Sequence, residues 1–312
     1  MKNCTLSFLM LLFHIGLAAQ QEVIVFRVSG QVQYFTHHGA TPVLLQPGME
    51  LGLSGKLRCK GSSSAKLLYK SSTYNLSGSN MRDVQEVVKA GKEASQMSFT
   101  GRFFSFITES VKDSESKEKL QKHHRRYMNK ASGGVKGYAT PDYAISALLL
   151  TTGKLPAANV IFKWRNTPGE GPYTFRLFAA NGDQVAQILV RDTALTLDLD
   201  QLSMEVFAEY TWNITRGADV KSASMPFEVC PDKAKEVEKE ISQDADFIAA
   251  DPVEQQLMLA YGLEEEHCFY EANRVYAELY GANPGNALLR KLYASFLARM
   301  DMLPEAIALM GH

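Results

Sequence analysis

The stretch Leu259-Ala260-Tyr261-Gly262-Leu263 is followed, 34 positions later, by Tyr293-Ala294-Ser295-Phe296-Leu297. The same spacing relates Glu271-Ala272 to Glu305-Ala306. A period of this length predicts a stacked array of helix–turn–helix units, which presents a surface for binding and carries no chemistry of its own. The sequence therefore favours binding over catalysis.

The repeated pattern resembles the tetratricopeptide repeat, with an ordinary pair of helical hairpins as the alternative. Ala260 and Ala272 are the small residues that let two helices approach closely, and Asn283-Pro284-Gly285-Asn286 supplies the turn between units. The family's usual tryptophan and glycine are replaced here by Gln256 and Ala260. Two units are fewer than the three that a stable core usually needs. We therefore expect residues 233–250 to form a capping helix, or the array to dock on a neighbouring domain.

The tetratricopeptide register implies a partner-binding groove on the inner face of the array. The residues that would line this groove are Glu254, Leu257, Tyr261, Glu264, Leu288, Lys291, Ser295 and Ala298. A groove that mixes tyrosine, acids and one lysine suits an extended peptide or a partner helix. We expect a protein or peptide partner there.

The 312-residue chain is too long for one ordinary core, and its composition changes along its length. Residues 82–136 carry a net positive charge and residues 228–312 a strongly negative one, which indicates separate modules. We predict a multidomain β plus α protein. Its modules are a signal peptide (1–20), a β domain (21–80), a basic helical segment or linker (81–136), a β-sandwich (137–230) and a helical domain (231–312).

Residues 21–80 alternate between apolar and polar side chains in short runs separated by turn signals, which predicts a small β-roll or sandwich. Val28-Ser29-Gly30-Gln31-Val32 and Ser64-Ala65-Lys66-Leu67 make this segment similar to the FecR-type β domain of bacterial envelope proteins. FecR itself has a cytoplasmic part and a spanning helix that we do not find in this sequence. The resemblance therefore implies an envelope setting but not the regulatory role of FecR.

Residues 137–230 contain about seven alternating runs, and Asn181-Gly182 between two of them predicts a hairpin. Phe162-Lys163-Trp164 and Tyr210-Thr211-Trp212 make this module resemble immunoglobulin and fibronectin type III domains. Trp164 and Trp212 could stack on sugar rings, but each is in phase with the aliphatic residues of its own strand. We expect both to lie in the core.

The first 19 residues have a lysine at position 2, an apolar run from Leu6 to Leu17 and small residues at the end. This arrangement predicts a secretory signal peptide, and the run is too short for a membrane anchor. We expect an exported protein, periplasmic or associated with the cell envelope, without a transmembrane segment after cleavage. Three cysteines remain, Cys59, Cys230 and Cys268, and they allow at most one disulfide.

The sequence contains none of the common nucleophile, metal-protease or phosphate-loop motifs, so we expect no enzymatic activity, no cofactor and no metal. The basic run at residues 122–127 is too short for a nucleic-acid footprint. The favoured hypothesis is a non-enzymatic, exported interaction scaffold. A glycan- or peptidoglycan-binding module and a FecR-derived sensor that works through a membrane partner are the alternatives.

Overall fold

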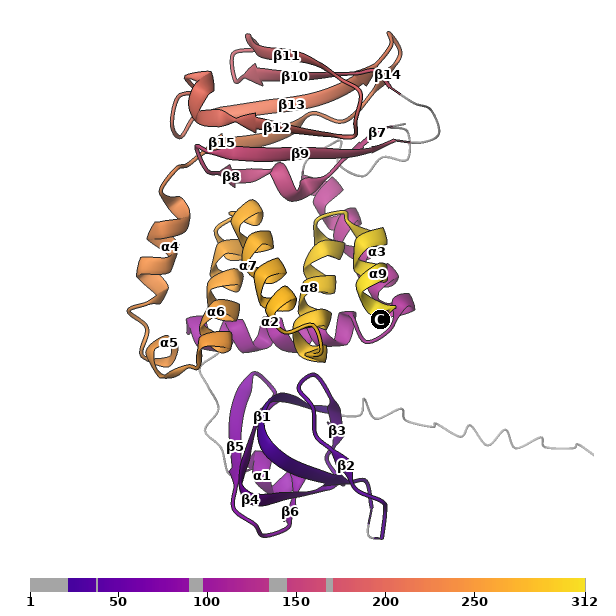
Figure 1. Ribbon diagram of the computed structural model, residues 1–312, viewed down its shortest axis with the longest axis vertical. Helices are drawn as coiled ribbons and strands as arrows, with labels where there is room; N and C mark the ends of the chain where they lie inside the picture. Colours follow the sequence, from indigo (N-terminus) through magenta and orange to yellow (C-terminus); the bar gives the residue numbers. More distant parts are fainter. Residues whose placement is uncertain (1–21, 38, 90–97, 135–144, 167–170, 312) are drawn as a thin grey trace, which may run out of the picture.

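The computed structural model describes residues 22–37, 39–89, 98–134, 145–166 and 171–311. Figure 1 shows a β unit at each end of the molecule and a layer of helices between them. The expected combination of several antiparallel sheets with packed C-terminal helix pairs is confirmed. The predicted signal peptide lies outside the described residues. Within those residues, every helix is too short or too polar to cross a bilayer.

The first β unit is built around two long antiparallel strands, β1 (Glu22–Phe35) and β4 (Lys56–Tyr69). The sheet order is β2-β1-β4-β5, with β3 against β1 and β6 against β4. The shorter elements are β2 (Val43–Leu44), β3 (Glu50–Gly52), β5 (Ser72–Ser77), β6 (Arg82–Asp83) and α1 (Val84–Lys89). Alternate side chains of a strand share one face, and these inner side chains join the valines of α1 in one core. The unit therefore extends past the predicted boundary at residue 80.

The second β unit consists of two sheets, one ordered β11-β10-β13-β15-β8 with β14 against β13, and the other β12-β9-β7. Its elements are β7 (Ile145–Ala147), η1 (Leu149–Thr151), β8 (Gly153–Leu155), β9 (Asn159–Asn166), β10 (Tyr173–Ala179), β11 (Gln184–Val190), β12 (Ala194–Asp198), η2 (Leu199–Leu202), β13 (Glu209–Arg216), β14 (Val220–Lys221) and β15 (Met225–Val229). Aromatic rings join the sheets, because the Phe162 ring lies 5.2 Å from that of Phe175 and 5.3 Å from that of Trp212. All pairs of these strands are antiparallel except β15 with β8.

The repeated sequence forms two helix pairs, α6 (Pro252–Glu265) with α7 (Phe269–Ala282) and α8 (Ala287–Arg299) with α9 (Leu303–Met310). Asp251 and Asn286 begin the first helix of each pair, and their side chains accept hydrogen bonds from free N–H groups of the first turn. The expected capping segment is divided into α4 (Lys233–Ile241) and α5 (Ala245–Ala249). Val237 and Ile241 of α4 pack against Gly262 of α6.

The segment predicted as a helical linker is part of the helical layer. Helix α2 (Phe99–Asp113) packs against α6 and α8, and α3 (Lys117–Gly134) packs against α8 and α9 (Figure 1). Ser98 caps α2, and Phe103, Phe104, Ile107 and Val111 of α2 are buried. The charged helix α3 likewise buries Leu120, His123 and Met128. Burial of an amphipathic face therefore holds this segment against the repeat.

Two glycines mark where the β units meet the helical layer. At Gly48 the backbone has φ +85°, and a Cβ there would lie 2.6 Å from the backbone nitrogen of Leu288. At Gly153 φ is +77°, and a Cβ would overlap the carbonyl oxygen of His267. That oxygen accepts a hydrogen bond of 2.9 Å from the N–H of Lys154. Positive φ and lack of space together require glycine at both contacts.

Candidate functional site

The residues predicted to line the groove lie on α6 and α8, on the side covered by α2 and the first β unit. Leu257, Tyr261, Leu288 and Ser295 are buried, and Glu254 is only 4% exposed. The helix pairs therefore present these side chains to other segments of the same chain. Whether they also bind an external partner stays a prediction.

Tyr261 receives the aromatic face of α2. Its ring centroid lies 5.6 Å from that of Phe99, 5.8 Å from that of Phe103 and 4.9 Å from that of Phe106. The Tyr261 hydroxyl donates to Glu265, whose carboxylate is paired with Arg102 of α2. Burial and this carboxylate raise the pKa of Tyr261 well above its usual range. The side chain therefore acts as a neutral anchor for α2.

A buried ion pair lies where α2 crosses the repeat. Arg299 of α8 is 8% exposed and places two nitrogens on the Glu264 carboxylate, with contacts of 2.8 to 3.0 Å. The Tyr276 hydroxyl donates to the same carboxylate at 2.8 Å. Burial opposes the charge of Arg299, but Glu264 and nearby tyrosines outweigh it and raise its pKa. This pair links α6, α7 and α8.

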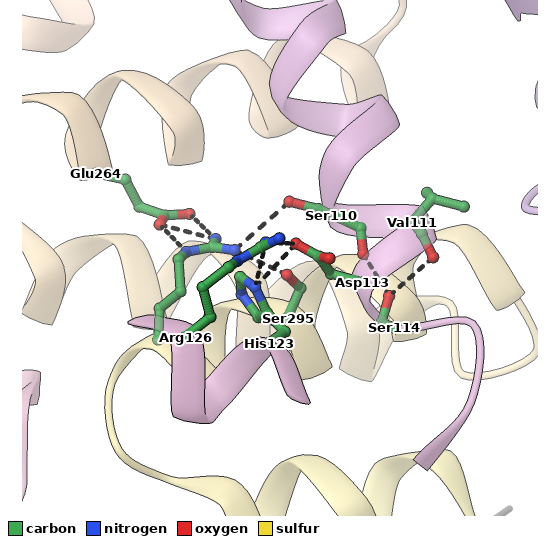
Figure 2. Close-up of polar contacts among 9 residues, drawn as sticks. Ser110, Val111, Asp113, Ser114, His123, Arg126, Glu264 and Ser295 are labelled. Carbon is green, nitrogen blue, oxygen red and sulfur yellow. Dashed lines mark hydrogen bonds and ion pairs between the residues drawn. The ribbon is translucent and has the colours of Figure 1, made fainter. Parts of the chain in front are cut away.

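The same guanidinium reaches α2. Arg299 donates to the Ser295 hydroxyl at 2.8 Å and approaches the Ser110 hydroxyl of α2 at 3.5 Å. Its guanidinium carbon lies 4.8 Å from the centre of the Phe106 ring, within the range of a cation–π contact. Figure 2 labels Glu264, Ser295 and Ser110, the three side chains with which the Arg299 guanidinium forms hydrogen bonds. Arg299 therefore joins the charged centre of the repeat to the helix that covers it.

A second polar group fixes the turn between α2 and α3. His123 Nδ1 and Arg126 both contact the carboxylate of Asp113, at 2.8 and 2.7 Å (Figure 2). Burial of Asp113 opposes its ionisation, but the hydrogen bonds and charges of His123 and Arg126 outweigh burial and lower its pKa. The carboxylate therefore holds α3 at a fixed angle to α2.

Salt bridges attach the first β unit to the same face. Lys66 of β4 places its ammonium 2.6 Å from the carboxylate of Glu254, and Arg27 of β1 pairs with Asp251. Lys291 of α8 reaches the carbonyl oxygen of Gly48 and the carboxylate of Glu50, each at 3.0 Å. Glu254 and Lys291, two of the three charged residues predicted to line the groove, therefore hold this β unit through β4 and through β3 and the turn before it.

The described residues also contain serine, histidine and acidic side chains in contact, but in an order unsuited to nucleophilic catalysis. Asp301 lies between His124, at 2.8 Å, and Ser146, at 3.1 Å. In a catalytic triad the histidine must lie between serine and acid to take the serine proton. Here both groups contact the carboxylate, which ties α3 and the second β unit to the turn before α9.

The remaining candidate residues occupy the interior. Trp164 and Trp212 are 2% and 0% exposed, so neither ring offers a platform for a sugar. Cys59, Cys230 and Cys268 are free and buried, and burial raises the pKa of Cys268 to about 12. A thiol with so high a pKa is a poor nucleophile. Among the described residues, no group of three or more His, Cys, Asp or Glu side chains could hold a metal ion.

Glu271, at the start of α7, gives the repeat a dependence on pH. Burial raises its pKa to about 7 from an ordinary value of 4.5, although its own backbone N–H and Arg274 oppose the shift. The folded state therefore binds a proton that the unfolded state releases, and stability falls as pH rises from about 4.5 through 7.

We expect Glu271→Gln to remove this penalty. The variant should be more stable than the parent protein by about 2–3 kcal/mol at pH 8, with a difference that disappears near pH 4. Chemical denaturation at both pH values measures this. Glu278→Gln, at an exposed position of the same helix, is the control. A constant difference between parent and Glu271→Gln across pH would contradict the prediction.

Comparison with known proteins found no family model that matches the chain and no matching curated protein. The geometry alone therefore defines the site as the inner face of two helix pairs, filled by a helix and a β unit of the same chain. The sequence predicted the groove residues of α6 and α8, but it did not predict that α2 and the first β unit would pack against them. The aromatic cluster at residues 99–107 was the available signal, because apolar rings at helical spacing need a partner surface.

Proposed function

We propose that this protein is a non-enzymatic scaffold exported to the bacterial cell envelope. Its helical layer holds two β units in place, and their outer surfaces meet other proteins. The observation that carries this proposal is the filled inner face, where α2 packs on Tyr261 and the first β unit is fixed by Glu254 and Lys291. Residues that a peptide would use are thus engaged in joining the modules.

The proposal includes finer assignments for the three modules. Two observations support tetratricopeptide-like units. Helices α7 and α9 begin 34 residues apart, and the small residues of the repeat are completely buried, namely Ala260, Ala272, Ala294 and Ala306. Two sheets joined through Phe162 and Trp212 support an immunoglobulin-like second β unit. The long β1–β4 pair with Gly30 at a bulge supports a FecR-like first unit.

The buried tryptophans favour the scaffold over the glycan-binding alternative, since stacking on a sugar needs an exposed ring. Large apolar side chains are instead exposed at separate places on the two β units. Leu44 of β2 is 51% exposed, and Phe207 before β13 is 73% exposed. Aromatic side chains are enriched at protein interfaces, and neighbouring exposed apolar side chains mark interaction surfaces.

A photo-crosslinking amino acid placed at single positions in the native envelope tests this function. We expect probes at Leu44 or Phe207 to yield adducts with other proteins, and a probe at Tyr261 to react only within the chain. An adduct from position 261 to another protein would show that a partner uses the groove. Probes that yield no intermolecular adduct at any position would refute the scaffold.

A further inference from the structure

The outer edge of the second β unit is open. Strand β11 pairs with β10 on one side, and the described part of the chain has no strand on its other side. Figure 1 places β11 at the end of the molecule farthest from the helical layer. An edge strand presents a row of unpaired N–H and C=O groups that can template another strand.

Strand β11 lacks most of the features that keep edge strands from pairing. Its sequence, Gln184–Val190, contains no charged residue and no proline, and the exposed fraction of Leu189 is 70%. Proteins usually protect edges with lysine, proline, short length or a bulge. In β11 the only such feature is a bulge at Val185, the second residue of the strand.

The sequence around β11 is complementary to itself when read in the opposite direction. In an antiparallel pair centred on Gln187, Asp183 of one copy lies opposite Arg191 of the other. Both of these flanking residues are exposed. Between Asp183 and the central Gln187, Gln184 lies opposite Val190, the bulged Val185 opposite Leu189 and Ala186 opposite Ile188, so that two of these three pairs join apolar residues.

We propose that β11 pairs with β11 of a second copy of this chain, so that two second β units share one continuous sheet across a two-fold axis at Gln187. Opposite charges and apolar pairs directly across an antiparallel ladder stabilise it, and like charges there destabilise it. Centring the pair on Ile188 instead would set Arg191 against Val185. The charge pattern therefore selects the Gln187 register.

The geometry of a closed dimer fits this position. An antiparallel strand pair has a two-fold axis through a pair of identical residues, so two copies cover each other's β11 and leave neither β11 open to a third copy. Because β11 lies at the end of the molecule, the helical layers of the two copies point away from each other (Figure 1). The interface is independent of the inner groove and of the proposed scaffold function.

Sedimentation velocity over a concentration series tests the proposal with the purified protein. We expect a monomer–dimer equilibrium whose dissociation constant rises about fivefold in Gln187→Lys, because two lysines then face each other on the axis. Gln85→Lys, at an exposed position of α1 at the other end of the molecule, makes the same substitution and should leave the equilibrium unchanged. Unchanged circular dichroism shows that each variant is folded.

Charge reversal tests the register. Asp183→Arg should weaken the dimer, and Asp183→Arg combined with Arg191→Asp should restore it. Gln187→Cys should form a disulfide between copies under mild oxidation, since residues opposite each other in a ladder lie within disulfide range. A protein that is monomeric at every concentration, a dimer insensitive to Gln187→Lys, or a double variant no stronger than Asp183→Arg would overturn the proposal.

Discussion

Replacing Arg299 with methionine is expected to lower the free energy of unfolding by about 3–5 kcal/mol, the largest single effect in the helical layer. The substitution leaves the Glu264 carboxylate buried without its main partner. It also removes the contacts of the guanidinium with Ser110 and with the Phe106 ring of α2. Urea denaturation followed by circular dichroism measures the loss.

Two further variants separate the cost of an unpaired charge from the value of the pair. Glu264→Gln with Arg299→Met removes both charges and keeps an acceptor for the Tyr276 hydroxyl, so it should be less destabilised than Arg299→Met alone. Arg274→Ala breaks an exposed ion pair with Glu278 and should cost less than about 1 kcal/mol. A double variant as unstable as Arg299→Met would show that the unpaired carboxylate is not the cause.

Replacing Gly153 with alanine is expected to separate the second β unit from the helical layer. The alanine must keep the positive φ of this position, which costs about 1–2 kcal/mol. Its Cβ also overlaps the carbonyl oxygen of His267. Relief of that overlap breaks the hydrogen bond from Lys154 to His267. We expect the overlap and the lost hydrogen bond to lower the free energy of unfolding by at least about 2 kcal/mol, in addition to the cost of positive φ.

Gly182→Ala is the matched control for this prediction. Gly182 has φ +88° in the hairpin between β10 and β11, and a Cβ there meets no atom within 4 Å. It therefore reports the backbone cost without the clash. Cys268, buried beside His267, should react faster with a thiol reagent in Gly153→Ala than in Gly182→Ala. Equal unfolding energies and equal thiol reactivity in the two variants would contradict the proposed contact.

The repeat, the β regions and their order could be predicted because they depend on local patterns. Alternation of period two and helical spacing of apolar residues are visible along a single segment, and the 34-residue period repeats one such pattern. Asn181-Gly182 lies in the hairpin that joins β10 to β11, as predicted, although of the two residues only Gly182 has the positive φ that a type I′ turn requires at both. The aromatic residues at 99–107 and the residues of the groove were each recognisable, but nothing in the sequence paired them.

Contacts between distant segments could not be predicted in the same way. Glu254 meets Lys66 and Lys291 meets Glu50 across most of the length of the chain, and these pairs depend on how whole modules dock. A charged residue on a helix face has the same sequence signature whether it binds a peptide, a neighbouring module or water. Arg299 follows a run of apolar residues in α8, and nothing in the sequence indicates its partners on α6 and α2.

The sequence by itself determined that two repeated helix pairs follow the β modules along the chain, because main-chain preferences and apolar spacing act over a few residues. Only the tertiary structure decided that the inner face of the repeat is filled by α2 and the first β unit. The physical reason is that two helix pairs are too few to bury their own apolar face. Phe99, Phe103 and Phe106 remove that face from water.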